Sequence, residues 1–212
     1  MNDLYLIPNS TVLKNLLGIT NEKELDLAEA ELSRANMMLL YENGFSDFSS
    51  GGFCFIHKFL FGDVYEWAGQ FRKINIQKRE ELLAGRSVWY SNVTEIGADL
   101  DKAFAEISKI DWDSLTREDF AKQIARLFPK LWQVHPFREG NTRTTVMMMT
   151  FFSQQAIIKS CLKRPFLKHK DQPREQRLFR VLRFMLTMNL SVQQMIAAKL
   201  SVFLKRANII FF

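Results

Sequence analysis

One run of residues, from His135 to Arg143, gathers the side chains of this chain that are best suited to phosphate chemistry. It reads His-Pro-Phe-Arg-Glu-Gly-Asn-Thr-Arg. Histidine titrates near neutrality, which suits a general base. A carboxylate such as Glu139 is a hard oxygen ligand for Mg²⁺, and an arginine such as Arg143 neutralises phosphate oxygens. The run therefore predicts a site where a proton is removed close to a bound phosphate.

The residues that follow favour an anion site at the start of a helix. Gly140 lets the backbone approach a ligand because it has no Cβ. Nearly every residue from 146 to 152 is apolar, which predicts a buried helix over residues 144–158. Free N–H groups at a helix N-terminus attract anions. The alternative is a surface ion pair of Glu139 and Arg143, but the density of reactive groups favours the phosphate site.

This stretch resembles the signature of the Fic family, His-x-Phe-x-Asp/Glu-Gly-Asn-Gly-Arg-x-x-Arg. The matching residues are His135, Phe137, Glu139, Gly140, Asn141 and Arg143. The chain departs from the pattern at Thr142, where the family usually has Gly, and at Val146, where it usually has a second Arg. The segment from Trp67 to Ile76 is similar to the one that forms the family's target-docking hairpin. The resemblance implies an all-α, Fic-like helical bundle with a small β-hairpin flap at residues 71–90.

The resemblance also implies a role for each matching residue. His135 would take the proton from a Ser, Thr or Tyr hydroxyl of a target protein, and that oxygen would attack a nucleotide phosphate. Glu139 would hold Mg²⁺ against the phosphates. The phosphates would be bound by Gly140, Asn141, Thr142 and Arg143, and Phe137 would anchor the loop in the core. The flap residues that would register the target are Lys73, Ile74, Asn75 and Ile76.

The activity so implied is that of a protein adenylyltransferase, which moves a nucleoside monophosphate from a nucleotide, with ATP as the expected donor, to the target hydroxyl. Val146 leaves the donor open because it replaces the arginine that the family uses on the terminal phosphate. One alternative is a Fic-type phosphotransferase with another diphosphate donor. Another is a non-catalytic basic helical module that binds a partner or nucleic acid. The family's inhibitory pattern, Ser/Thr-x-x-x-Glu-Gly/Asn, begins at Thr20, Ser91 and Ser114 and is completed at none of them.

Composition favours a single helix-rich domain over the 212 residues. The chain is 47% hydrophobic and has 19 Phe and 9 Met against 9 Gly and 5 Pro, which is typical of helical packing. It has neither an apolar run long enough for a bilayer nor the basic start of a signal peptide, so we expect a cytoplasmic protein without membrane contact. Cys54 and Cys161 show no metal spacing and are expected to be reduced thiols.

The net charge of +6 is concentrated near the C-terminus. The window from Lys159 to Arg183 holds nine basic and two acidic residues, and thus carries +7 while the rest of the chain carries −1. A solvated helix face is the commoner explanation for such a window, so nucleic acid is not the expected partner. Assembly with further copies of the chain, as a homo-oligomer, stays open.

Periodicity and turn signals predict four parts within the single domain: an N-terminal arm and helices (1–50), the flap (71–90), a helix–loop–helix core (117–158) and basic C-terminal helices (159–212, with patterns at 178–186 and 191–204). Within the first part, residues 4–17 indicate an arm leading into a short helix. Apolar residues at three- and four-residue steps from Leu25 to Leu39, including Leu27 and Met38, then predict one packed face.

The remaining helices are expected over residues 53–61, 91–110 and 116–134, the last capped by Thr116 and kinked at Pro129. His57 lies in the first of these. A core histidine is favoured there over a metal ligand, because no second ligand lies at helical spacing from it.

Overall fold

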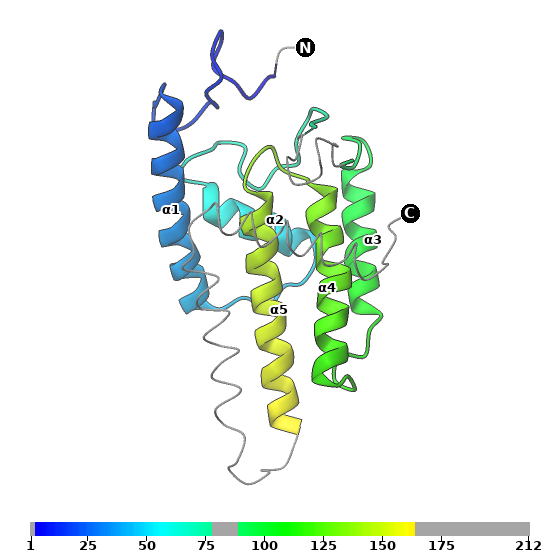
Figure 1. Ribbon diagram of the computed structural model, residues 1–212. Helices are drawn as coiled ribbons and strands as arrows, with labels where there is room; N and C mark the ends of the chain where they lie inside the picture. Colours follow the sequence, from blue (N-terminus) through cyan, green and yellow to red (C-terminus); the bar gives the residue numbers. More distant parts are fainter. Residues whose placement is uncertain (1–2, 78–88, 164–212) are drawn as a thin grey trace.

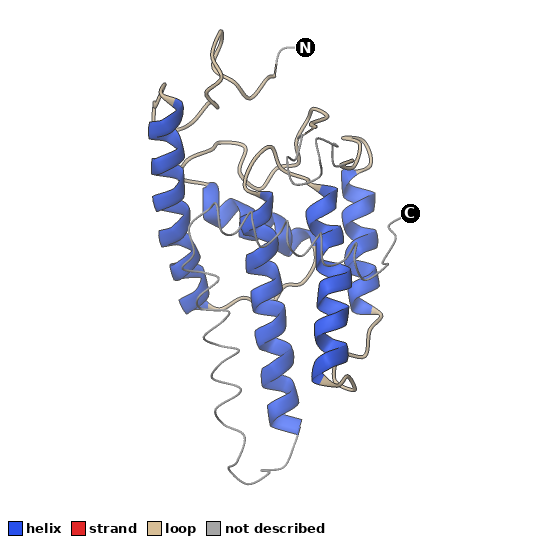
Figure 2. Cartoon of the chain, viewed as in Figure 1, coloured by secondary structure: helices blue, strands red, loops and turns tan. Residues whose placement is uncertain are grey.

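The computed structural model describes residues 3–77 and 89–163. The helices of these ranges are α1 (Glu22–Asn43), α2 (Ser50–Phe61), α3 (Ile96–Ser108), α4 (Arg117–Val134) and α5 (Asn141–Lys163) (Figure 1). Within the same ranges, β pairing is limited to an isolated antiparallel bridge between Leu6 and Leu13 (Figure 2). The fold is therefore all-α, as the sequence predicts.

The core of the protein surrounds α2, which lies across the other helices (Figure 1). It packs against α1, α3 and α5, while α4 packs between α3 and α5. Its side chains Phe53, Ile56, Leu60 and Phe61 are fully buried. Because α2 is apolar on most of its surface, it suits the centre of the bundle, and α4 and α5 meet the loop that joins them at one end of it.

Local capping sets several helix ends. Thr116 caps α4 as predicted, since its Oγ1 accepts the N–H of Asp119 at 3.1 Å. Asn21 and Ser49 cap α1 and α2 in the same way. Gly44 ends α1 with a positive φ of 74°, a conformation that costs little without a Cβ.

Three predictions about the helices are wrong. The short helix predicted within residues 4–17 does not form, because the chain reverses at Asn9, which has a φ of 59°, and Ile7 donates its N–H to the carbonyl of Val12. The helix predicted over 91–110 begins only at Ile96. Asn92 delays its start, since the side chain of Asn92 accepts hydrogen bonds from the N–H and hydroxyl of Thr94.

The third correction concerns the packed face of α1. Leu27 and Met38 are 67% and 62% exposed. The buried stripe is instead Leu25, Glu29, Ser33, Met37 and Leu40. Two polar residues stand on that stripe because they bond to α5, as the site shows below. This buried stripe was detectable in the sequence, since its residues also recur at steps of three or four.

One further boundary differs from expectation. The buried helix predicted over 144–158 begins earlier, at Asn141, and thus takes in the end of the loop. The helix α4 ends at Val134, as predicted, and contains Pro129 in its interior. In the described ranges, no helix is long and apolar enough to cross a membrane.

The predicted flap is described only in part. Residues 71–77 and 89–90 are loop, and the side chains at 73–77 alternate between exposed and half-buried as the sequence pattern indicates. Residues 78–88, the C-terminal helices and nearly all of the basic window lie outside the described residues. Those predictions stay predictions.

Candidate active site

The loop from His135 to Gly140 joins α4 to α5 and takes its shape from two residues with left-handed backbone. His135 caps α4 with φ 52° and ψ 56°. Gly140 precedes α5 with φ 81°, and a Cβ there would lie 2.4 Å from the ring of Phe61. Gly140 is therefore required by both conformation and space, whereas Thr142 has the right-handed helical backbone expected for a residue with a β-branched side chain.

The imidazole of His135 contacts two aromatic side chains, which also contact each other. It is 3% exposed. The ring of Tyr90 stacks on it with 3.9 Å between centroids and 19° between planes, and Trp132 meets it edge-on at 5.7 Å. Trp132 is itself fixed, since its Nε1–H donates to the hydroxyl of Thr142 at 3.0 Å. These contacts restrict the directions in which the His135 ring can point.

Glu139 is anchored through its main chain by His57. The Nε2 of His57 lies 2.9 Å from the carbonyl oxygen of Glu139, and its Nδ1 accepts the N–H of Gly69 at 2.8 Å. The proton of this neutral ring must therefore sit on Nε2. Burial lowers the pKa of His57 to about 3. The prediction of a satisfied core histidine is confirmed.

The side chains of Phe137 and Asn141 close the loop on itself. Phe137 is fully buried and stacks on His57 at 3.8 Å and on Phe53 at 5.7 Å. Asn141 accepts the N–H of Phe137 at 2.9 Å and donates to its carbonyl at 2.8 Å. The amide of Asn141 is thus used inside the loop, which leaves its main chain as the part that can face a ligand.

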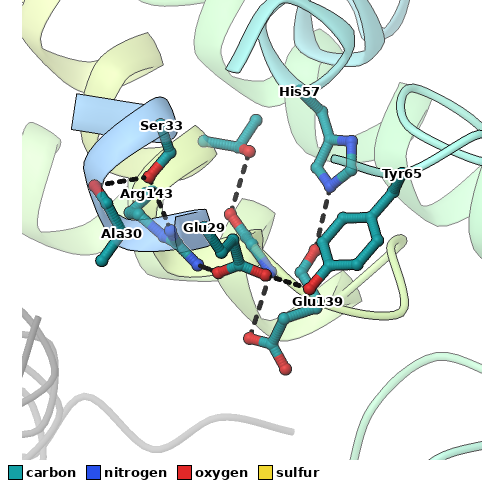
Figure 3. A network of polar contacts seen from close by, with 9 residues as sticks. Glu29, Ala30, Ser33, His57, Tyr65, Glu139 and Arg143 are labelled. Carbon is teal, nitrogen blue, oxygen red and sulfur yellow. Dashed lines mark hydrogen bonds and ion pairs between the residues drawn. The ribbon is translucent and has the colours of Figure 1, made fainter. Parts of the chain in front are cut away.

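Arg143 is buried in a polar network between α5 and α1 (Figure 3). It is 4% exposed, forms an ion pair with Glu29, and donates to the hydroxyl of Ser33 at 2.8 Å. Its guanidinium also lies 4.5 Å from the ring centre of Phe61. The hydroxyl of Tyr65 donates to the same Glu29 carboxylate, and burial, followed by the charge of Glu29, raises the pKa of Tyr65. The network ties the first turn of α5 to α1.

The N-terminal arm holds the outer side of the loop. The guanidinium of Arg138 donates to Oδ2 of Asp3 from Nε at 3.0 Å and from Nη2 at 2.8 Å. The hydroxyl of Tyr5 accepts the N–H of Lys73 at 3.0 Å, at the start of the predicted flap. The same arm therefore contacts both the loop and the flap root.

A model of the Fic/DOC family matches residues 47–153. This chain belongs to the Fic/DOC family. The matched region runs from just before α2 to the middle of α5, and so contains the whole loop from His135 to Gly140.

Among proteins similar to this Fic/DOC chain, "Protein adenylyltransferase" of Bartonella henselae is 36% identical over 153 residues, which are 66% of this chain and 28% of that protein. "Probable protein adenylyltransferase y4lH" of Sinorhizobium fredii is 31% identical over 158 residues, 74% of this chain and 78% of that protein. The chain thus corresponds to about a quarter of the first relative and to most of the second.

A solved structure agrees with the fold. The N-terminal Fic domain of a cell filamentation protein from Bartonella quintana, with bound ADP, superposes with a TM-score of 0.62 at 28% identity. The match covers 72% of this chain and 76% of that chain.

The Fic/DOC signature located the loop but not the residues that hold it. Glu29, Tyr65 and Arg72 were not singled out by sequence reasoning. A carboxylate on the buried stripe of α1 was a usable signal for Glu29, because a buried charge needs a partner. Tyr65 and Arg72 gave no comparable local signal.

Proposed function

We propose that this chain is a protein adenylyltransferase, which transfers AMP from ATP to a Ser, Thr or Tyr hydroxyl of a target protein. The observation that carries the proposal is the loop itself, in which His135 and Glu139 flank the buried anchor Phe137 and lead directly into the N-terminus of α5. The names of the Bartonella and Sinorhizobium relatives support the same activity.

In the proposed reaction, His135 takes the proton of the target hydroxyl as its oxygen attacks the α-phosphorus of ATP. The bond from that phosphorus to the bridging oxygen of the β-phosphate breaks, and pyrophosphate leaves with its electron pair. Such a transfer depends mainly on position and charge neutralisation. The contacts of Tyr90 and Trp132 with His135 favour the correct position, because they restrict the directions in which the imidazole can point.

The loop suits a single Mg²⁺ shared with the nucleotide. Within the described residues, no group of three His, Cys, Asp or Glu side chains is placed to hold a metal ion. One carboxylate is nevertheless sufficient for Mg²⁺, which usually keeps several waters and takes other ligands from phosphates. Glu139 would hold the ion, and the ion would neutralise phosphate charge.

Phosphate binding is assigned to the start of α5. The main chain of Gly140, Asn141 and Thr142 would face the phosphates at the positive end of the helix dipole. Arg143 joins them in this proposal by exchanging its contact with Glu29 for a phosphate. The residues from Lys73 to Ile76 would dock the target, as an exposed segment beside the loop.

Val146 favours a second candidate, a phosphotransferase with another diphosphate donor. Position 146 lies one turn beyond Arg143 and is half-buried. A valine there cannot bind a terminal phosphate. A donor without a γ-phosphate would therefore lose less binding free energy than ATP from the missing arginine.

Intact-mass measurement after incubation with candidate donors tests both functions. The purified protein is mixed with Mg²⁺ and ATP, ADP or another diphosphate compound, and self-modification is followed. Addition of AMP supports the adenylyltransferase, whereas addition of a different donor moiety supports the phosphotransferase. The adduct should disappear with a chelator, and Glu139→Gln should be partly rescued by raised Mg²⁺, because the neutral amide competes poorly with water for the ion.

A non-catalytic role predicts the opposite pattern. Absence of any adduct, together with salt-dependent nucleic-acid binding that survives His135→Ala, would overturn the proposal.

A further inference from the structure

Arg72 is a buried cation whose partners, among the described residues, are main-chain carbonyls. It is 2% exposed. Its Nε–H donates to the carbonyl of His135 at 2.9 Å and its Nη1 to that of Ile74 at 2.8 Å. Its Nη2 donates to the carbonyl of Ser91. One side chain thus joins the active loop to both sides of the predicted flap.

Burying a guanidinium is unfavourable because the charged group loses its water, so its hydrogen bonds must compensate for that loss. Burial lowers the pKa of Arg72 because the charged form loses water. Its planar fork of N–H donors is suited to satisfying several carbonyls at once. An apolar side chain of similar size would leave those carbonyls without these donors in the interior.

The backbone of His135 needs such support. Its left-handed conformation, with φ 52°, is uncommon for a residue with a Cβ because the Cβ crowds the following carbonyl oxygen. Arg72 holds both carbonyls after that turn, that of His135 through Nε and that of Pro136 through its own main-chain N–H at 2.7 Å. The direction in which α4 delivers the imidazole is therefore set partly by Arg72.

Arg72 also holds the other half of the ring stack. Ser91, whose carbonyl it binds, directly follows Tyr90, and the Tyr90 ring lies 3.9 Å from the ring of His135. The same guanidinium therefore fixes the main chain on both sides of the stacked pair. A change at Arg72 should loosen the two rings relative to each other.

We propose that Arg72 is a positioning residue that keeps the imidazole of His135 stacked on Tyr90 and thereby aims it at the target hydroxyl. The catalytic consequence rests on the proposed function, whereas the control of the ring stack does not. Among the described residues, the hydrogen bonds of Arg72 go to the main chain of other residues than Glu139 and the start of α5, so its loss should act on the rate of transfer and leave nucleotide binding unchanged. A displacement of about 1 Å at a reacting group can cost on the order of 100-fold in rate.

The test uses Arg72→Lys, which keeps the charge but cannot reach three carbonyls with one ammonium group. With three histidines in the chain, protein labelled with ¹³C-histidine gives few Cε1–H signals, and His135→Ala identifies that of His135. Tyr90→Leu shows where this signal lies without the ring current of the stack. Lys130→Met is the matched control, since Lys130 is a cation of α4 that pairs with Glu106 at 2.6 Å.

We expect Arg72→Lys to move the His135 signal toward its position in Tyr90→Leu, and to lower kcat by about 10- to 100-fold with the nucleotide KM unchanged. Lys130→Met should leave the signal and kcat in place. Arg72→Met should show the larger change of the two Arg72 variants, because it retains no donor.

An unmoved His135 signal in a folded Arg72 variant overturns the proposal. So does failure of both Arg72→Lys and Arg72→Met to fold, because Arg72 would then be a residue of overall stability. If the parent transfers nothing from any donor while the signal still moves, the proposed function fails and the control of the ring stack by Arg72 stands.

Discussion

The two described histidines, His57 and His135, occupy neighbouring regions of one protein and resemble each other in burial. His57 is fully buried and stacks on Phe137 at 3.8 Å, and His135 is 3% exposed and stacks on Tyr90 at 3.9 Å. His57 lies inside α2, and main-chain groups from two other segments bond to its ring nitrogens. His135 lies at the end of α4, where Arg72 binds its carbonyl and aromatic rings hold its faces.

Burial and stacking are shared by both histidines, so neither feature by itself separates a structural histidine from the one proposed as the general base. The observed difference lies in the anchoring, since main-chain groups bond to both ring nitrogens of His57, whereas Arg72 binds the main-chain carbonyl of His135. The backbone fixes His57 in one neutral form, which suits it to anchor the carbonyl of Glu139. His135 is held by its main chain and ring faces, an arrangement that sets the direction of an imidazole.

Removing each ring in turn tests whether the two histidines differ in role. His135→Ala should slow transfer by about 10² to 10⁴, the usual range for a lost general base, with little change in melting temperature. His57→Ala should instead lower the melting temperature, because the carbonyl of Glu139 and the N–H of Gly69 lose their partner. Initial rates and melting curves of both variants are the measurement. Full activity in His135→Ala would remove it from the reaction.

The anchoring region can be tested through its ion pair. Glu29→Gln leaves the Arg143 guanidinium buried without its counter-charge, and breaking such a pair should lower the free energy of unfolding by about 3–5 kcal/mol. Urea unfolding measures it. The control is Glu106→Gln, whose pair with Lys130 has side chains 31% and 30% exposed, so the loss should be about 0–1 kcal/mol. Equal losses in the two variants contradict the buried network.

In the structure, Arg143 is paired with Glu29 of α1. A new arginine further along α5 would add a second cation to the proposed phosphate-binding region. Val146→Arg places a guanidinium one turn along α5 at a half-buried position. One charge-assisted hydrogen bond of about 1.5–3 kcal/mol should tighten ATP relative to ADP by roughly 10- to 100-fold. Calorimetric titration of both nucleotides, with a melting curve, decides. An unchanged preference in a stably folded variant means that position 146 does not face the terminal phosphate.

Per pH unit, the smallest effect concerns the protonation of His57. Its pKa falls from 6.5 to about 3 through burial, with the charges of Arg143 and Glu139 nearby. Between those values the unfolded chain binds more protons than the folded one, so stability should fall as the pH falls, by up to about 1.4 kcal/mol per pH unit. His57→Gln should remove this part of the slope. Parallel stability curves for parent and variant over that window would show that His57 does not titrate as inferred.

The sequence by itself determined the features that depend on neighbours along the chain. Thr116 and Asp119 are three residues apart, so the cap of α4 could be predicted from them. The apolar run after Gly140 predicted the existence of α5, although not its first residue, Asn141. The order of residues from His135 to Arg143 indicated a phosphate site and the Fic/DOC family. The all-α class followed from composition and helical periodicity.

Only the tertiary structure decided which distant groups hold that chemistry in place. Glu29 meets Arg143 across 114 residues, His57 meets Glu139 across 82, and Arg72 meets His135 across 63. Such pairs depend on how α1, α2 and the flap root pack against the loop, and no local spacing encodes that packing. The partners are main-chain groups for His57 and Arg72, and side chains from several elements for Glu29 and Arg143. The sequence therefore gives the types of these groups. Their pairing depends on the packed arrangement in which every buried donor and charge finds a partner.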